Sequence, residues 1–191
     1  MGKLGTFTFV SLEGYYKGVN NDISWNKHGK EENEFAGQNA NATPGGGTLV
    51  FGRVTYEMMA AFWPTPMAAE LLPDVARGMN NARKIVFSNT LKTASWNNTT
   101  IISGDLGTEV RKLKMETPHD MTILGSGSII TRLASLGLID NFQIMLNPIA
   151  IGAGTPLFQG IDPPINLKLI NTRTFNSGVV LLCYEPVLSD R

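Results

Sequence analysis

A run of small residues follows a short apolar segment past the middle of the chain. Met121–Leu124 is typical of a buried strand, and Gly125-Ser126-Gly127-Ser128 comes directly after it, before a stretch with helical spacing. Glycine and serine give up side-chain packing, but they let a ligand come close to the backbone. The first N–H groups of the following helix face the same space and favour an anion there. The turn therefore predicts an anion site, and a phosphate is the anion that we expect.

Two further strand ends carry residues of a similar kind. Gly52-Arg53-Val54-Thr55 follows the apolar run Thr48–Phe51 and opens a helix, and Ser88-Asn89-Thr90 follows another predicted strand. Ligands of open α/β sheets bind beyond the carboxyl ends of the strands. If the three strands are neighbours, their turns supply two helix starts, an arginine and several hydroxyl groups along one edge. Such a set suits an extended ligand with several phosphates, such as a dinucleotide.

Two common nucleotide-binding motifs do not fit these turns. Gly125-Ser126-Gly127 supplies the first part of G-x-G-x-x-G, but Ile130 stands at the third glycine position. The acidic residue expected about 20 residues further on is also missing, because that position falls near Met145 and Asp140 comes too early. A P-loop is excluded because the chain has no G-K-[ST] sequence. Each turn alone is explained equally well as an ordinary tight turn, so the hypothesis depends on the three together.

Composition restricts the class of protein. The chain has 191 residues, of which 42% are hydrophobic and 17% charged, and its formal net charge is zero, as in ordinary globular domains. No basic stripe is visible, so nucleic acid is not an expected partner. One cysteine, Cys183, and two histidines are too few for a zinc site, and we expect no metal. No apolar run approaches a membrane span and the amino terminus lacks a signal-peptide pattern, so we expect a cytoplasmic protein without a membrane partner.

An alternation of strands and helices must position the three turns. Strands are predicted at residues 6–12, 48–51, 84–88, 99–102, 121–124 and 142–150. Helices are predicted at about 31–40, 53–62, 67–80, 105–114 and 129–136, with Asp105 as an N-cap and Gly137 after the last helical turn. Residues 166–175 and 179–185 predict a closing hairpin, whereas 15–30 and 152–156 are expected to be irregular. This order predicts one α/β domain over residues 1–191, with three α-β-α layers and a mixed, mainly parallel sheet.

The three turns also resemble those of a known family. "GRVTYE" (Gly52–Glu57), "VFSNT" (Val86–Thr90) and "ILGSGSII" (Ile123–Ile130) have the order and spacing of the dihydrofolate-reductase-like superfamily. "SLEGYYKG" (Ser11–Gly18) and "GLIDNFQIMLNPIAIGAGTPLF" (Gly137–Phe158) resemble one branch, which comprises the reductase domain of bacterial riboflavin biosynthesis and its small stand-alone relatives. The resemblance covers nearly the whole chain, and the last segment is its most specific part.

This resemblance implies an NADPH-dependent reductase with a sheet of dihydrofolate reductase type. The G-R-x-T segment would bind cofactor phosphates, the loop after the next strand would receive the adenosine 2′-phosphate, and the glycine turn would cradle the pyrophosphate. The cofactor-binding residues that it implies are Gly52, Arg53, Thr55, Ser88, Asn89, Thr90, Gly125, Ser126, Gly127, Ser128 and Ile129. Because Arg53, Ser88 and Asn89 can meet a 2′-phosphate together, we expect NADPH to be preferred over NADH.

The chain departs from its relatives at positions near the substrate. Gly125 stands where riboflavin reductases carry a glutamate, and the L-P-W segment of the folate enzymes has no good counterpart at Ile23–Asn26. Folate reductases also carry Gly-Gly, joined by a cis peptide, in place of Gly125-Ser126. We expect a pyrimidine or pterin-like substrate, and the best named candidate is 5-amino-6-(5-phosphoribosylamino)uracil. A dihydrofolate reductase and a dinucleotide-binding protein without turnover are the alternatives.

Three residues are candidates for the substrate side of the site. Glu13 ends the first predicted strand, beside the nicotinamide position that the family implies, and is the best candidate for a proton donor. Tyr15 and Trp25 could stack on a flat heterocycle. Each residue has an ordinary alternative, such as a turn carboxylate for Glu13 and a cap on the core for Trp25.

The expected partners are a small-molecule substrate and a second copy of the chain. The closing hairpin and the strand predicted at 142–150 offer apolar surface for pairing. The riboflavin branch of the family usually pairs, so the resemblance implies a homodimer.

Overall fold

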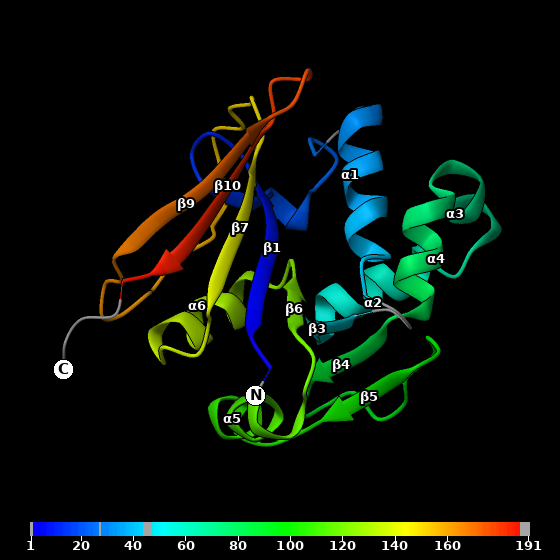
Figure 1. Cartoon of the computed structure of the whole chain (residues 1–191), viewed down its shortest axis with the longest axis vertical. Helices are drawn as coiled ribbons and strands as arrows, with labels where there is room; N and C mark the ends of the chain where they lie inside the picture. The colour runs from blue at the N-terminus through cyan, green and yellow to red at the C-terminus, as the bar shows by residue number, and fades with distance from the viewer. Residues whose placement is uncertain (1, 27, 44–46, 188–191) are drawn as a thin grey trace.

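The computed structural model describes residues 2–26, 28–43 and 47–187, which form an eight-stranded central sheet (Figure 1). The strand order is β5-β4-β3-β6-β1-β7-β10-β9. Neighbours from β5 to β7 pair in parallel, and β10 pairs antiparallel with both β7 and β9. The predicted mixed sheet with a closing hairpin is therefore confirmed. Its strands are β1 (Leu4–Val10), β3 (Thr48–Gly52), β4 (Arg83–Phe87), β5 (Thr99–Ile102), β6 (Met121–Leu124), β7 (Asn141–Leu146), β9 (Leu167–Thr174) and β10 (Val180–Pro186).

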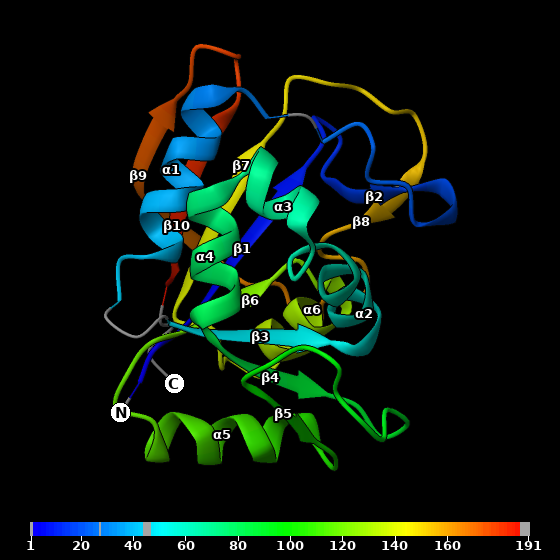
Figure 2. The same cartoon turned by 90° about the vertical axis from the view of Figure 1, so that its right-hand side faces the viewer.

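Helices cover both faces of this sheet (Figures 1 and 2). The helices are α1 (Lys30–Ala40), α2 (Arg53–Phe62), α3 (Pro66–Leu71), α4 (Pro73–Asn81), α5 (Leu106–Glu116) and α6 (Gly127–Ser135). Side chains alternate across each strand, so Val50 of β3 packs with α5 and α6 while Phe51 packs with α2 and α4. This arrangement confirms the three predicted α-β-α layers. None of the helices in the described residues combines the length and the apolar character that crossing a lipid bilayer requires.

Prolines set two boundaries that differ from the expected ones. Residues 67–80 form two helices instead of one, because Pro73 starts α4 and Leu72 before it leaves the helical conformation (φ −141°, ψ 63°). The strand expected at 142–150 ends at Leu146. Beyond it, the Asn147 N–H donates to the Val10 carbonyl and the Leu12 N–H donates to the Ile149 carbonyl, but the Ile149 N–H turns back across Pro148 to the Asn147 carbonyl, so the regular ladder with β1 stops there.

A two-stranded ribbon replaces irregular backbone that we expected in two places. β2 (Tyr15–Gly18) pairs antiparallel with β8 (Gly154–Pro156), and a short 3₁₀ turn, Val19–Asn21, follows β2. The ribbon lies beyond the carboxyl end of β1, beside the edge where the predicted turns gather (Figure 2). It is anchored there because the N–H of Ser11 donates to the Tyr15 carbonyl. The ribbon therefore covers one side of the predicted site.

Candidate functional site

The three predicted turns lie side by side at one edge of the sheet. Strands β4, β3 and β6 are adjacent in that order, and all three run in the same direction. Their carboxyl ends therefore meet at one edge, as the hypothesis required. Thr55 of α2 lies against the glycine turn, since a Cβ atom at Gly125 would be 3.3 Å from Thr55 Cγ2. The structure thus brings together two of the turns that were predicted separately.

Ser126 connects these two turns by a hydrogen bond. The Gly52 N–H at the end of β3 donates to Ser126 Oγ over 3.0 Å. Gly125 (φ 62°) and Ser126 (φ 54°) both have left-handed backbone conformations, which cost a serine about 1–2 kcal/mol. The peptide bond between them is trans. Among the described residues, a cis peptide bond is found at Asp162-Pro163. The hydrogen bond offsets the left-handed serine and fixes the spacing between the β3 and β6 turns.

The start of α6 offers N–H groups to a ligand. Ile129 and Ile130 both donate their N–H groups to the Ser126 carbonyl, over 2.9 and 3.1 Å. The N–H groups of Gly127 and Ser128 precede the first N–H groups that donate within the helix, as at every helix start. They lie at the positive end of the helix dipole. The Ile129 side chain itself is buried in the core, so only its backbone belongs to this surface.

Tyr16 of β2 lies directly over Gly127. A Cβ atom at residue 127 would be 2.5 Å from Tyr16 Cε1 and 2.6 Å from Cζ. The missing side chain at this position is therefore required by the tyrosine ring, whatever ligand the turn binds. Sequence reasoning selected Tyr15 instead, which packs against Gly154 in β8. It missed Tyr16 because nothing in the local pattern indicated the β2–β8 ribbon.

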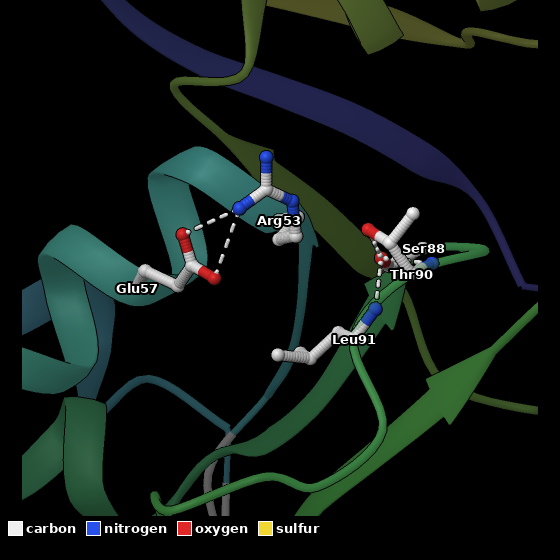
Figure 3. A network of polar contacts seen from close by, with 5 residues as sticks. All are labelled: Arg53, Glu57, Ser88, Thr90 and Leu91. Carbon is white, nitrogen blue, oxygen red and sulfur yellow. Dashed lines mark hydrogen bonds and ion pairs between the residues drawn. The ribbon is translucent and has the colours of Figure 1, made fainter.

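Arg53 is engaged within its own helix. Its Nη1 lies 3.0 and 3.1 Å from the two carboxylate oxygens of Glu57, one helical turn further along α2. Both side chains are about half exposed, at 46% and 47%. Figure 3 shows the guanidinium group turned toward Glu57 and away from the loop that carries Ser88 and Thr90. A phosphate could still reach the remaining donors of this exposed group, because the ion pair uses one of its nitrogens.

The loop after β4 holds its polar side chains in local hydrogen bonds. Ser88 Oγ accepts from the N–H groups of Thr90 and Leu91, over 3.2 and 2.9 Å (Figure 3). Asn89 Oδ1 accepts from the N–H of Gly104 over 2.9 Å, which ties this loop to the segment between β5 and α5. The three predicted residues of the loop are at the expected edge, and two of them stabilise backbone there.

Glu13 is held by the backbone of a neighbouring loop. Its Oε1 accepts from the N–H groups of Ile151 and Gly152, both over 2.9 Å, and its Oε2 accepts from the Ser11 hydroxyl over 2.6 Å. These hydrogen bonds, that of the hydroxyl most of all, lower the pKa of Glu13 to about 2. A carboxyl group with this pKa carries almost no proton at neutral pH. The contacts favour a structural role, and the predicted role as proton donor stays a prediction.

The remaining substrate-side candidate, Trp25, is held by its own loop. Its indole N–H donates to the Asp22 carbonyl over 3.2 Å. Nearby in the sequence, the His28 ring packs against Phe9 of β1 at a tilt of 42°, with ring centroids 4.3 Å apart. Burial lowers the pKa of His28, although the charge of Glu32 opposes this. The predicted stacking of Tyr15 and Trp25 on a substrate stays a prediction.

Comparison with known proteins identifies relatives along nearly the full length of the chain. A family model described as the RibD C-terminal domain matches residues 3–181. The uncharacterized protein YyaP of Bacillus subtilis (strain 168) is 30% identical over 178 residues, which is 92% of this chain and 90% of that protein.

Two solved structures with the same fold are described as proteins of different function. A putative riboflavin biosynthesis protein from Shewanella sp. PV-4 superposes with a TM-score of 0.72 at 20% identity, covering 97% of this chain and 99% of that one. A dihydrofolate reductase from Enterococcus faecalis, complexed with NADP(H), gives a TM-score of 0.65 at 15% identity, with 97% and 96% covered. At these identities the likeness shows the fold alone, and it confirms the predicted sheet of dihydrofolate reductase type.

Proposed function

The chain belongs to the RibD C-terminal domain family, and we propose that it is an NADPH-dependent reductase of a pyrimidine or pterin-like small molecule. The observation that carries this proposal is the meeting of three phosphate-compatible turns on the adjacent strands β4, β3 and β6. The complex of the Enterococcus faecalis dihydrofolate reductase with NADP(H) supports the choice of cofactor. A structurally similar protein from Thermotoga maritima is described as a diaminohydroxyphosphoribosylaminopyrimidine deaminase and 5-amino-6-(5-phosphoribosylamino)uracil reductase, which supports 5-amino-6-(5-phosphoribosylamino)uracil as the first substrate to test.

The residues at the edge of the sheet fit a dinucleotide. The left-handed Gly125-Ser126 turn presents the start of α6, whose first N–H groups suit a pyrophosphate. The hydrogen bond between Ser126 Oγ and Gly52 N–H fixes the position of the turn after β3 relative to the turn after β6. Tyr16 covers this surface from the side of the ribbon and would limit the access of water. When bound, NADPH would supply the hydride, and the chain would bind and orient it.

The proton that accompanies the hydride needs a source with a suitable pKa. Glu13 is the predicted donor, but its pKa of about 2 means that the carboxyl group has already lost its proton at neutral pH. In the proposed reaction its carboxylate holds Ile151 and Gly152 at the edge of the site by accepting their N–H groups. Water or a group of the substrate itself would then supply the proton.

The cofactor part of the proposal is tested by a charge placed at the start of α6. Ser128 is exposed there, and Ser128→Glu would suit the helix dipole, so the fold should keep its stability. The same carboxylate would repel a pyrophosphate, and we expect the NADPH dissociation constant to rise about tenfold or more, equivalent to ~1.4 kcal/mol. Ser128→Gln is the matched control, because it adds the same bulk without the charge. Equal affinities of the two variants would remove the glycine turn from the cofactor site.

The reductase part is tested by turnover. NADPH oxidation is followed by absorbance with 5-amino-6-(5-phosphoribosylamino)uracil and, separately, with dihydrofolate. Oxidation with the first compound alone is the expected result. Oxidation with dihydrofolate alone would identify a folate reductase, and tight binding of NADPH without oxidation of either compound would favour a dinucleotide-binding protein.

A further inference from the structure

We propose that a buried contact between Tyr56 of α2 and Trp96 holds the loop after β4 in place for the adenosine end of the cofactor, and that this contact sets the preference for NADPH over NADH. This inference rests on the proposed function. Tyr56 follows Arg53 by three residues in α2 and is 2% exposed. Trp96 lies between β4 and β5 and is 3% exposed. Because both residues are buried, they act on a ligand through the loop, as positioning residues.

The contact joins α2 to the segment between β4 and β5 by a hydrogen bond. The backbone N–H of Trp96 donates to the Tyr56 hydroxyl over 3.0 Å. The two rings also pack together with centroids 6.3 Å apart, and Phe51 of β3 packs with both. A buried N–H group that loses its acceptor destabilises the fold. The hydroxyl therefore defines where the segment lies relative to α2.

Two further residues, from α4 and β4, fix the indole ring of Trp96. Its indole N–H donates to Asn80 Oδ1 over 2.7 Å. The ammonium group of Lys84 lies 4.4 Å from the ring centroid, within the range of a cation–π interaction. Lys84 is 0% exposed, and its Nζ also donates to the carbonyls of Asn80 and Ala82, over 2.9 Å each. Burial lowers the pKa of Lys84 to about 8, so the group still carries its charge at neutral pH.

The position of Trp96 is transmitted to the predicted phosphate-binding residues by the loop itself. Leu91 and Ala94 pack against the same apolar cluster as Tyr56 and Trp96. The N–H of Leu91 also donates to Ser88 Oγ over 2.9 Å (Figure 3). A movement of Trp96 relative to α2 would therefore shift Leu91, and the Ser88 hydroxyl with it.

The three cofactor turns are thus linked in pairs. The hydrogen bond between Ser126 and Gly52 joins the turns after β6 and β3, and the Tyr56–Trp96 contact joins the start of α2 to the loop after β4. The 2′-phosphate is the part of the cofactor that we expect at this loop, and NADH lacks it. Loss of the second link should therefore affect NADPH and spare NADH.

The test measures dissociation constants by calorimetry for NADPH, NADH and adenosine 2′,5′-bisphosphate. Tyr56→Phe keeps the ring in the core and removes only the hydroxyl. We expect it to weaken NADPH and the bisphosphate about fivefold to tenfold, and NADH by about twofold or less. Lys84→Met removes the charge beside the Trp96 ring and should weaken NADPH relative to NADH by about threefold. Val179→Ala is the stability control, because it removes buried apolar atoms far from the three turns, and it should change none of the three constants.

A double variant shows whether Tyr56 acts through the loop. In a Ser88→Ala background, Tyr56→Phe should change the affinity for NADPH by about twofold or less, because the group that it positions is gone. Full effects of both substitutions in the double variant would overturn the inference.

Other outcomes separate this inference from the proposed function. If Tyr56→Phe weakens NADPH and NADH equally, or weakens neither, the inference is wrong and the reductase proposal still stands. The same holds if the wild type binds the two cofactors equally well. A wild-type protein that binds neither cofactor refutes the proposed function. In that case, binding of the bisphosphate that Tyr56→Phe weakens would still support the inference, and absence of such binding would refute both.

Discussion

Replacing Gly127 with alanine should displace the Tyr16 ring from the start of α6. A Cβ atom at this position would lie 2.5, 2.6 and 2.9 Å from three atoms of the ring, whereas carbon atoms in contact are normally ~3.5–4.0 Å apart. The overlap is about 1 Å, which small adjustments do not relieve. Ile130 and Leu133 anchor α6 in the core with 0% exposure, while the tyrosine is only half-buried. The ring therefore moves, and the helix stays.

The size of the effect follows from two opposing contributions. Forcing a packed side chain from its position costs about 1–3 kcal/mol. Alanine is a better helix former than glycine by up to ~1 kcal/mol, and this gain is available because Gly127 has no left-handed φ. We expect Gly127→Ala to lower the free energy of unfolding by about 1–2 kcal/mol. In a Tyr16→Ala background the same substitution should be neutral or stabilising, which gives a coupling free energy of about 1–3 kcal/mol.

The assay is urea unfolding of the wild type, the two single variants and the double variant, compared at equal m-values. Effects that add to within ~0.5 kcal/mol would show that the ring does not lie on Gly127, and would refute the reasoning. The double variant also isolates what the cofactor itself needs. If NADPH binds it as tightly as it binds Tyr16→Ala, the glycine serves the tyrosine, and the pyrophosphate tolerates a methyl group there.

Three further predictions concern the edge of the site and the assembly. Ser126→Ala and Ser126→Gly both lose the hydrogen bond from Gly52, but only glycine relieves the strain of the left-handed φ. We therefore expect Ser126→Ala to be less stable than Ser126→Gly by about 1 kcal/mol. Equal free energies of unfolding in urea would contradict the left-handed turn. The pKa of Glu13 is about 2 in the folded protein and ~4.3 when unfolded, so its contribution to stability is present above pH ~4.3 and is lost as the pH falls toward 2. Glu13→Gln should flatten that part of the pH–stability profile, whereas a ~10²–10⁴-fold slower hydride step at unchanged stability would identify Glu13 as the acid. We also propose a homodimer through β9, whose Leu169 and Ile170 are 49% and 50% exposed; light scattering at micromolar concentration should give twice the chain mass of 20.8 kDa, and the mass of one chain would refute it.

The turns could be predicted because each is a local feature of the sequence. At two of them an apolar run, a glycine and then helical spacing occur within about a dozen residues, and at the third a polar Ser-Asn-Thr follows an apolar run, so neighbours in sequence are also neighbours in space. Asp105 is a similar case, since its carboxylate accepts the N–H of Thr108 over 2.9 Å as the cap pattern predicts. The meeting of β3, β4 and β6 followed from the rule for parallel sheets together with the resemblance.

Contacts between distant segments could not be predicted in this way. The pairing of Ser126 Oγ with Gly52 depends on the spacing of two strands that the sequence does not place. The fixation of Glu13 depends on the loop at Ile151 and Gly152, far along the chain. Its low pKa is a property of those hydrogen bonds, and no local signal around Glu13 indicates them. A carboxylate at a strand end was therefore an ambiguous candidate until its partners were known.

Tyr15 and Tyr16 show most directly how pairing decides chemistry. Neighbouring residues of a strand point to opposite faces, so the residue that faces Gly127 depends on whether the segment is a strand and on its register. The segment "YYKG" has no clear apolar alternation, and its partner, Gly154–Pro156, has a composition typical of a loop. The observed register pairs Tyr15 with Pro156 and Lys17 with Thr155, with an irregularity between the two pairs. A shift of one residue would place Tyr15 or Lys17 over the start of α6, so the ring that covers this turn is selected by the ribbon and not by the residues of the turn.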